Sequence, residues 1–315
     1  MDQPIQIKRR DKKTFTKNVR RHWVLLLMLT PAIVHVLVFS YAPMTGLVLA
    51  FKNYRYADGI FGSPWVGLQN FRFLILSNKL FTITRNTILY NLAFLIANML
   101  VEVSFAIMLS EMLGKLFKRF AQSFMFLPYF VSWVVVKAVM YNLFNYEKGV
   151  ANNLLIMLGM TPFDLYNIPN AWPPLLVFLR LWKSAGYGTV IYLAAVTGMD
   201  REMLEAAEID GAGIWQKIFR IILPQLVPTM FIMLLLGVGN IFRGDFGMFY
   251  QTTGNSSTLL SVTDIIDTYV FRALMSSGDI GMAASAGFYQ SVLCFITIMI
   301  FNWLVKLYES DYSLF

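Results

Sequence analysis

Six long apolar runs constrain this chain more than any other feature of its sequence. The runs cover about 23–43, 86–110, 121–144, 173–199, 221–242 and 280–305, and each carries few or no charges. A helix needs about 20 apolar residues to cross the hydrocarbon core of a bilayer. Because a helix satisfies its own backbone hydrogen bonds in lipid, each run predicts a transmembrane helix. The sequence therefore predicts an all-α, polytopic membrane protein of about six transmembrane helices.

The composition agrees with a chain whose solvent is the bilayer. Hydrophobic residues make up 57% of the sequence and charged residues only 14%, which is about half of the charged share of a soluble domain. The mean hydropathy is +0.58. Cys294 is the single cysteine, so neither an intrachain disulfide nor a cysteine-based metal site is expected.

Basic residues set the expected orientation. Residues 1–22 hold eight of the 26 lysines and arginines and directly precede the first apolar run. This placement favours an anchor beside anionic membrane lipid over nucleic-acid binding. With the N-terminus in the cytoplasm, the inside segments carry 15 basic residues and the outside segments carry 8. The positive-inside rule therefore predicts that both termini are cytoplasmic.

Residues 200–224, between the fourth and fifth runs, then lie on the cytoplasmic side. Asp200 can cap a short helix, and Asp210-Gly211 can end it because Gly211 tolerates a positive φ. Five acidic residues against Arg201 give residues 200–210 a net charge of −4, which is unusual on the side where basic residues collect. Taken alone, the segment fits a solvated amphipathic linker as well as a docking surface.

The spacing of residues within this loop resembles a known motif. Glu205-Ala206-Ala207 is followed by Asp210-Gly211-Ala212 and then by Phe219, Ile222, Leu223 and Pro224. The pattern resembles the EAA loop of type I ABC importer permeases, where the loop forms a coupling helix that docks on the ATPase subunit. The resemblance implies ATPase coupling by Glu205, Ala206, Ala207, Asp210 and Gly211. Phe219, Leu223 and Pro224 are expected to hold the loop against the helix bundle.

Two further segments extend the resemblance over nearly the whole chain from about residue 23. The stretch 65–71 resembles the outside segment before the second span of sugar-type permeases. The stretch 266–303 resembles the branch that imports complex oligosaccharides, to which alginate-type oligouronide importers belong. The resemblance implies the type I ABC importer permease fold, with a basic cytoplasmic segment at 1–22, a transmembrane permease domain at 23–308 that contains the coupling loop 200–224, and a cytoplasmic tail at 309–315.

The same resemblance implies the function and the partners. The chain is expected to be a multi-pass subunit of the bacterial cytoplasmic (inner) membrane that moves a carbohydrate by alternating access. Its expected partners are a second permease subunit in a heterodimer, two ATPase subunits, an extracytoplasmic solute-binding protein and membrane lipid. ATP and Mg would be bound by the ATPase subunits, so no cofactor is expected in this chain.

Charged residues inside the predicted spans indicate a substrate path. A charge at mid-helix costs about 2.5–3.5 kcal/mol on insertion scales, so each one needs a reason. Arg180, Ser184 and Tyr187 recur at i, i+4 and i+7, which is one helix face, and in sugar permeases of this family the corresponding face lines the translocation cavity. A guanidinium matches a carboxylate bidentately, which suggests an acidic oligosaccharide. The predicted substrate path comprises Arg180, Lys183, Ser184, Tyr187, Asn240 and Arg243, and snorkelling of the basic residues to outer headgroups is the alternative.

The sequence alone excludes some alternative functions and leaves two others open. No G-x-x-x-x-G-K-[ST] run is present, so the chain cannot be the ATPase itself. The sequence has no histidine cluster and no recognisable catalytic triad, so neither an enzyme nor a metal site is predicted. A permease of the same class for a neutral sugar or another solute is the nearer alternative. An ion-coupled secondary transporter is the more distant one, because repeated halves and several mid-membrane carboxylates would be expected and Glu102 stands alone.

Overall fold

The computed structural model describes residues 21–76, 78–112 and 114–308. The predicted basic segment, apart from Arg21 and His22, and the predicted tail 309–315 lie outside the described residues. Within the described ranges the chain forms helices and no strand, which confirms the all-α class. The helical segments, with η marking 3-10 and π turns, are α2 (Trp23–Val36), η1 (Leu37–Tyr41), η2 (Ala42–Phe51), α3 (Gly59–Gly62), α4 (Gln69–Leu76), α5 (Lys79–Glu111), α6 (Lys115–Phe126), η3 (Leu127–Phe130), α7 (Trp133–Phe144), α8 (Val150–Met157), η4 (Leu165–Asn167), η5 (Pro169–Ala171), α9 (Trp172–Thr197), α10 (Arg201–Ile209), α11 (Ile214–Lys217), η6 (Ile218–Ile222), α12 (Leu223–Gly239), α13 (Phe246–Thr252), η7 (Ser257–Leu259), α14 (Leu260–Thr263), α15 (Ile266–Met275) and α16 (Ile280–Tyr308).

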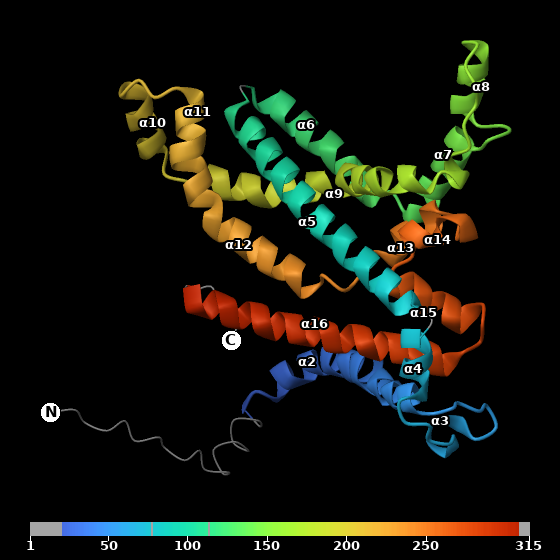
Figure 1. The fold of residues 1–315 in the computed structure, drawn as a ribbon. Coiled ribbons are helices and arrows are strands. Elements are labelled where there is room, and N and C mark those ends of the chain that lie inside the picture. The colour runs from blue at the N-terminus through green and yellow to red at the C-terminus, as the bar shows by residue number, and fades with distance from the viewer. Residues whose placement is uncertain (1–20, 77, 113, 309–315) are drawn as a thin grey trace.

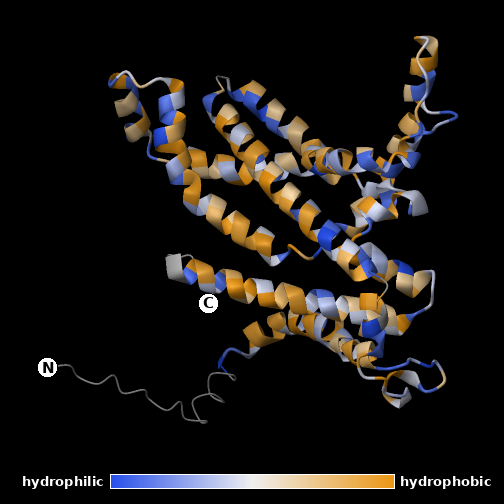
Figure 2. Cartoon of the chain, viewed as in Figure 1, coloured by the Kyte–Doolittle hydropathy of each residue, from blue (hydrophilic) through white to orange (hydrophobic). Residues whose placement is uncertain are grey.

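Four of the described helices are long and apolar enough to cross a membrane. They are Trp23–Phe51, which joins α2, η1 and η2, then α5, then Ile214–Gly239, which joins α11, η6 and α12, and finally α16. Figure 2 shows long apolar stretches on these segments. A fifth span arises when Lys115–Phe130 and Trp133–Phe144 are counted together, but the two helices meet at an angle of 91°.

The predicted third span, 121–144, is therefore broken rather than straight. Pro128 lies in the first turn of η3, and Val131 and Ser132 that follow have extended backbones. Ser132 then caps α7 by accepting the backbone N–H of Val135 at 3.4 Å. Helical hydrogen bonding thus stops and restarts within a few residues, which is the physical reason for the bend.

The predicted fourth span is α9, a helix of 26 residues. It is long enough to cross a membrane but less apolar than the four helices above. Arg180, Lys183 and the run of small and polar residues from Ser184 to Thr189 lower its hydropathy. α9 packs against α5, α6 and α12. Its polar side chains therefore have protein rather than lipid as neighbours, which is how a membrane protein accommodates such residues.

Two apolar clusters hold α5 and α9 together and leave a polar zone between them. In the first cluster Tyr90 and Phe94 of α5 pack with Leu176 of α9. In the second, Val103 of α5 packs with Tyr192 of α9, further along both helices. Each cluster is built from side chains that are at least nine-tenths buried. The polar side chains of Asn98 and Glu102 on α5 and of Arg180 and Ser184 on α9 lie in the interval between these two clusters.

A broad apolar surface remains uncovered on the outside of the bundle. No residue of the most apolar window of Trp23–Phe51 is buried within the chain. Exposed leucine, valine and phenylalanine side chains continue over α6, α7 and α16. Apolar area of this extent marks contact with lipid or with another subunit.

The connection between the first span and α4 is fixed by one buried lysine. Lys52 is only 2% exposed. Its Nζ donates to the carbonyls of Ile60 at 3.1 Å and Phe61 at 2.6 Å, and it lies 5.0 Å from the centre of the Trp65 ring. Asn70 donates to the Lys52 carbonyl at 3.1 Å. The stretch 65–71 is thus tied directly to the end of the first helix.

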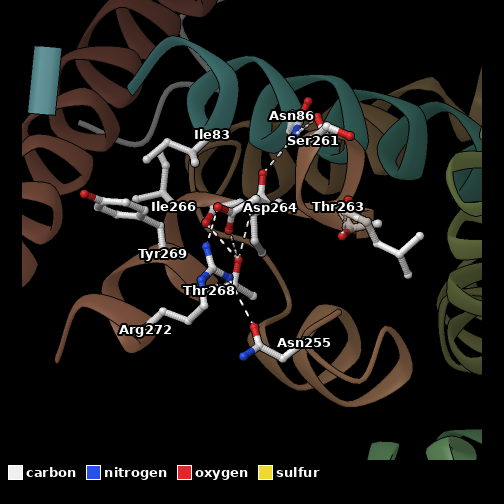
Figure 3. Close-up of polar contacts among 12 residues, drawn as sticks. Ile83, Asn86, Asn255, Ser261, Thr263, Asp264, Ile266, Thr268, Tyr269 and Arg272 are labelled. Atoms are coloured by element: carbon white, nitrogen blue, oxygen red, sulfur yellow. Dashed lines mark hydrogen bonds and ion pairs between the residues drawn. The ribbon is translucent and has the colours of Figure 1, made fainter. Parts of the chain in front are cut away.

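A second polar cluster joins the start of α5 to α15 (Figure 3). Asp264 is 7% exposed and forms an ion pair with Arg272. The hydroxyl of Thr268 donates to the Asp264 carboxylate at 2.7 Å, and Asn86 of α5 donates to the Asp264 backbone carbonyl at 3.0 Å. Arg272 also donates to the side chain of Asn255 at 3.4 Å. The cluster therefore links segments that are far apart in the sequence.

The segments fall into two groups at opposite ends of the bundle (Figure 1). The turn from α5 to α6, the pair α10 and α11, and the C-terminal end of α16 all lie toward the left of the view. α3, α8 and α15 lie toward the right. The alternation of connections agrees with the predicted spans, and the side of the membrane that each group faces stays a prediction.

We expect Asp264→Asn to destabilise the protein by about 3 kcal/mol, because it leaves the largely buried Arg272 without a counter-ion. The measurement is the apparent Tm of the purified transporter assembly. Asp279→Asn is the matched control: Asp279 caps the start of α16 by accepting the Met282 N–H at 2.8 Å, and asparagine caps as well as aspartate. Adding Arg272→Gln to Asp264→Asn should recover part of the loss, and equal Tm values for the two single variants would contradict the expectation.

Candidate functional site

A cavity of about 520 Å³ opens between α5, α9, α12 and the loop that follows α12. Its wall is mixed: charged, amide and hydroxyl side chains stand beside apolar ones such as Leu95, Met233 and Leu236. Phe94 of the first apolar cluster and Tyr192 of the second also line it. Of the six residues predicted for the substrate path, five line it: Arg180, Ser184, Tyr187, Asn240 and Arg243. The structure therefore brings together residues of the fourth predicted span and of the end of the fifth, while their role in transport stays a prediction.

Arg180 is the central charge of the cavity, and it has a partner within the chain. Its Nη1 lies 3.1 Å from Oδ2 of Asp245, and its guanidinium carbon lies 5.9 Å from the centre of the Phe94 ring. The Nε atom is buried and makes no hydrogen bond within the described part of the chain. Because Asp245 supplies a counter-ion, the presence of Arg180 alone does not require an acidic substrate, and this weakens the argument made from the sequence.

The next layer of the cavity joins α9 to α5 by a hydrogen bond. Ser184 Oγ lies 2.9 Å from Asn98 Oδ1 and 2.7 Å from the Arg180 carbonyl of its own helix, and its single hydroxyl hydrogen can be donated to either acceptor. Tyr187, one turn further, stacks on Tyr129 with ring centres 5.0 Å apart and planes 12° apart. An amide, a hydroxyl and stacked phenol rings are suited to a ligand with many hydroxyl groups.

Lys183 does not line the cavity. Its Nζ points to the bend between η3 and α7, where it contacts the carbonyls of Tyr129 at 2.9 Å, of Pro128 at 3.4 Å and of Val131. It also lies 5.3 Å from the centre of the Trp133 ring. Helical hydrogen bonding stops at this bend, and the lysine is a donor to all three carbonyls, of which Pro128 also accepts the Val131 N–H at 3.1 Å. The structure thus gives Lys183 a place at the bend rather than on the predicted path.

Glu102 lines the deeper part of the cavity and is 7% exposed. Its carboxyl group occupies the space in which Gly188 of α9 has no side chain: a Cβ at Gly188 would lie 2.0 Å from Glu102 Cδ. Glycine is therefore required at this crossing for α5 and α9 to approach each other with the carboxyl group between them. The sequence indicated Glu102 only as a carboxylate in a span, and the glycine opposite could not be paired with it from spacing alone.

Asn240 and Arg243 line the mouth of the cavity and are both exposed. The Asn240 side chain donates to the Leu236 carbonyl of its own helix at 3.1 Å. Asn91 of α5 donates to the Arg243 carbonyl at 3.0 Å, so the backbone after α12 is held against α5. Asn91 and Asp245 were missed from the sequence; Asp245 lies two residues after Arg243 and beyond the end of the predicted fifth span, whereas Arg180 lies within the fourth.

The loop at 200–224 folds as a short helix, a turn and a second helix, as predicted. Asp200 caps α10 by accepting the Glu202 N–H at 2.9 Å, and Gly211 has φ of +78°, so both local predictions are confirmed. The two helices are braced by Lys217 and Glu208, whose Nζ and Oε1 lie 2.5 Å apart.

The predicted coupling residues lie together on this exposed loop. Glu205, Ala206, Asp210 and Gly211 are exposed, and Ala207 is half-buried. Among the described residues Glu208 of this acidic helix pairs with Lys217, whereas Glu205 and Asp210 form no ion pair. The loop thus exposes these residues to the surroundings, while Leu204 on its other side packs on the second apolar cluster.

The three residues predicted to support the loop have different environments. Leu223 packs against the second apolar cluster, in which Ile222 is 1% exposed. Phe219 is 61% exposed and stacks on Trp215, with ring centres 6.0 Å apart, and Pro224 is exposed in the first turn of α12. The contact with the bundle is therefore made by Ile222 and Leu223 together with Leu204 and Ile218, which pack on the same cluster.

Comparison with known proteins gives the family. Residues 99–310 match the family described as "Binding-protein-dependent transport system inner membrane component". This chain belongs to that family.

Its relatives and structural neighbours cover nearly the full length of this permease. The polygalacturonan/rhamnogalacturonan transport system permease protein YteP of Bacillus subtilis (strain 168) is 31% identical over 311 residues, which are 99% of this chain and 96% of the relative. A crystal structure of a bacterial ABC transporter involved in the import of the acidic polysaccharide alginate contains a chain that aligns with a TM-score of 0.83 at 29% identity, covering 93% of this chain and 98% of that one. The bacterial alginate ABC transporter in complex with an alginate pentasaccharide-bound periplasmic protein aligns with a TM-score of 0.81 at 29% identity over 92% and 96%. The fold of this permease is thus the type I ABC importer fold that the sequence predicted.

We expect Gly188→Ala to destabilise the permease by roughly 1–3 kcal/mol, because the new methyl group overlaps the Glu102 carboxyl group. The measurement is the apparent Tm of the purified assembly. Gly287→Ala is the control, since a Cβ there meets nothing within 4 Å and alanine favours the helix α16. Glu102→Ala should rescue Gly188→Ala, and a Tm loss that persists in the double variant would argue against the overlap as its cause.

Proposed function

We propose that this chain is one permease subunit of an ATP-driven importer that moves a carbohydrate, most specifically an acidic oligosaccharide, across the bacterial cytoplasmic membrane. The observation that carries the proposal is the cavity between α5, α9 and α12, with charged, amide and hydroxyl groups in its wall, in a chain of this transport family. The named substrates of the relatives support a carbohydrate: polygalacturonan and rhamnogalacturonan for one, and alginate for the structural neighbours.

The assembly in this proposal contains four further proteins. A second permease subunit would cover part of the exposed apolar surface and complete the cavity, two ATPase subunits would bind ATP and Mg, and a solute-binding protein would deliver the sugar from outside. The neighbour solved with a periplasmic protein carrying an alginate pentasaccharide supports the last partner. The count of basic residues supports cytoplasmic termini.

The loop 200–224 would couple this subunit to an ATPase. α10 is exposed, acidic and held in a fixed position by its Asp200 cap and by the Lys217–Glu208 contact. A rigid surface can transmit displacement, because it moves as a unit rather than deforming locally. ATP-driven closure of the ATPase subunits would move α10 and, through it, convert the cavity between inward-open and outward-open forms.

The acidic nature of the substrate rests on the cavity together with the relatives. Arg180 presents a guanidinium to the cavity with one contact to Asp245 and with Nε unpaired. A carboxylate on the substrate could use the remaining donors. A neutral sugar or another solute is the second candidate, and the existing Arg180–Asp245 pair favours it, because the pair leaves the guanidinium already neutralised.

Uptake into proteoliposomes that contain the complete importer separates these two candidates. We expect the native importer to take up an oligouronate faster than its carboxyl-reduced counterpart. Arg180→Ala should slow oligouronate uptake about tenfold, which corresponds to one charge-assisted hydrogen bond. Arg180→Lys should restore it only partly, because it keeps the charge and loses the planar fork. Arg72→Ala, which removes an exposed arginine of α4, is the control. Equal uptake of the two sugars by the native importer would remove the acidic substrate and leave the carbohydrate proposal standing.

Coupling is tested at the turn after α10. Gly211→Pro should abolish most of the substrate-stimulated ATP hydrolysis, because proline cannot adopt φ of +78° or donate the N–H that reaches the Glu208 carbonyl at 3.0 Å. Glu205→Ala should weaken docking more mildly. Both variants should still insert in the membrane at native levels.

Gly159→Pro is the matched control for the turn variant. Gly159 has φ of +71° and donates to the Ile156 carbonyl at 3.0 Å, but it follows α8 at the opposite end of the bundle. Its replacement should leave the ratio of stimulated to basal ATP hydrolysis unchanged. Normal coupling in both Gly211→Pro and Glu205→Ala would refute the assignment of the loop.

A further inference from the structure

Asp245 is the meeting point of three helices at the mouth of the cavity. Its Oδ1 accepts the backbone N–H of Met248 at 3.0 Å and so caps α13. Its Oδ2 accepts two side-chain donors: Trp133 Nε1 of α7 at 3.0 Å and Arg180 Nη1 of α9 at 3.1 Å. Each carboxylate oxygen therefore has at least one donor, and Arg180 is only one of the three.

Arg180, in contrast, is only partly engaged. The ion pair with Asp245 uses a single nitrogen, so it is not the two-bond fork that arginine forms with a well-placed carboxylate. Nε is buried and has no hydrogen-bond partner in the described ranges of the chain. A buried donor without an acceptor is costly and rare in a folded protein. The guanidinium lines the cavity, and an acceptor that entered it could therefore gain more from Arg180 than Asp245 does.

We propose that Asp245 is a competing counter-ion that the acidic group of the substrate displaces from Arg180 and that reclaims Arg180 when the substrate leaves. The inference rests on the proposed function and adds a residue that sets selectivity and release. Arg180 would contact the substrate directly, and Asp245 would act through Arg180 as a positioning residue.

The displacement is feasible because neither carboxylate is left without donors. When Arg180 turns to a substrate carboxylate, Asp245 keeps the N–H groups of Trp133 and Met248. The substrate carboxylate gains the fork that Asp245 leaves unused. A sugar without an acidic group offers only hydroxyl oxygens and competes poorly with a charged partner.

The competition also solves a problem of transport. A site that holds its cargo through an unopposed charge would bind tightly and release slowly. A resident carboxylate that returns to Arg180 lowers the affinity for acidic cargo and leaves neutral cargo nearly unaffected. Selectivity and release would thus be set by the same side chain.

The test is a binding measurement on the complete importer in lipid nanodiscs, with labelled trigalacturonate and its carboxyl-reduced counterpart as the two probes. Asp245→Asn keeps an oxygen that can cap α13 and removes the competing charge. We expect this variant to bind trigalacturonate about tenfold more tightly than the native importer, which is the weight of one charge-assisted hydrogen bond, and to bind the neutral probe within about twofold of native. In uptake assays both KM and the maximal rate for trigalacturonate should fall.

Three variants separate this role from a structural one. Trp133→Phe removes a neutral donor to the same oxygen and keeps the charge, so the ratio of acidic to neutral binding should stay within about twofold of native. Asp164→Asn changes an aspartate that caps η4 outside the cavity, so the ratio of trigalacturonate binding to neutral-probe binding should stay at the native value. Asp245→Ser is the second uncharged capping variant, and it should shift the ratio in the same direction as Asp245→Asn.

The outcomes are distinct. Tighter binding of both probes, weaker binding of trigalacturonate, or failure of both Asp245 variants to assemble would overturn the proposal, the last by assigning Asp245 to folding. A ratio that shifts equally in Trp133→Phe would also overturn it. Failure of the proposed function would be seen differently, as a native importer that takes up neither sugar, whereas failure of this inference is an unchanged ratio in an importer that works.

Discussion

The packing of α5 along α9 is the constraint on which the rest of the structure depends. Contacts recur every four residues on both helices, from Phe94 beside Arg180 to Glu102 beside Gly188. Equal steps of one turn on each helix mean that the two run in the same direction and share one continuous seam. Apolar clusters close this seam at both ends, so its polar middle is held inside protein. The cavity is what remains where α12 meets the seam.

Every basic side chain that α9 carries into the bundle has found oxygen within the chain. Arg180 meets the Asp245 carboxylate, and Lys183 meets the carbonyls at the break between η3 and α7. A lone charge at mid-membrane is expensive, and each of these contacts offsets part of that cost. The two cations nevertheless differ in their capacity to bind a ligand. Lys183 is surrounded by backbone acceptors, whereas Arg180 has one side-chain partner and a donor without a partner in the described chain.

Features that depend on a few neighbouring residues could be predicted from the sequence, and features that depend on distant ones could not. Apolar runs predicted the helices, and the local chemistry of Asp200 and Gly211 predicted how α10 begins and ends. The family motif predicted the fold. The face of α9 was predicted only in part: Lys183 lies three residues after Arg180, near enough to share its face, and the broken neighbouring helix draws it away. Asp245 could not be assigned to Arg180, because 65 residues separate them and only tertiary packing joins them.

The helical segment from Ile214 to Gly239, which bends at the π turn η6, connects the coupling loop to the cavity. One end adjoins α10, and the other leads within a few residues to the loop that holds Asp245. Twenty-six helical residues span about 39 Å, so the segment is a lever arm that crosses most of a bilayer. A small tilt imposed at the α10 end would move the far end by several ångströms, more than an ion pair tolerates. Force applied on one side of the membrane could thus open a bond on the other side without any chemical signal passing between them.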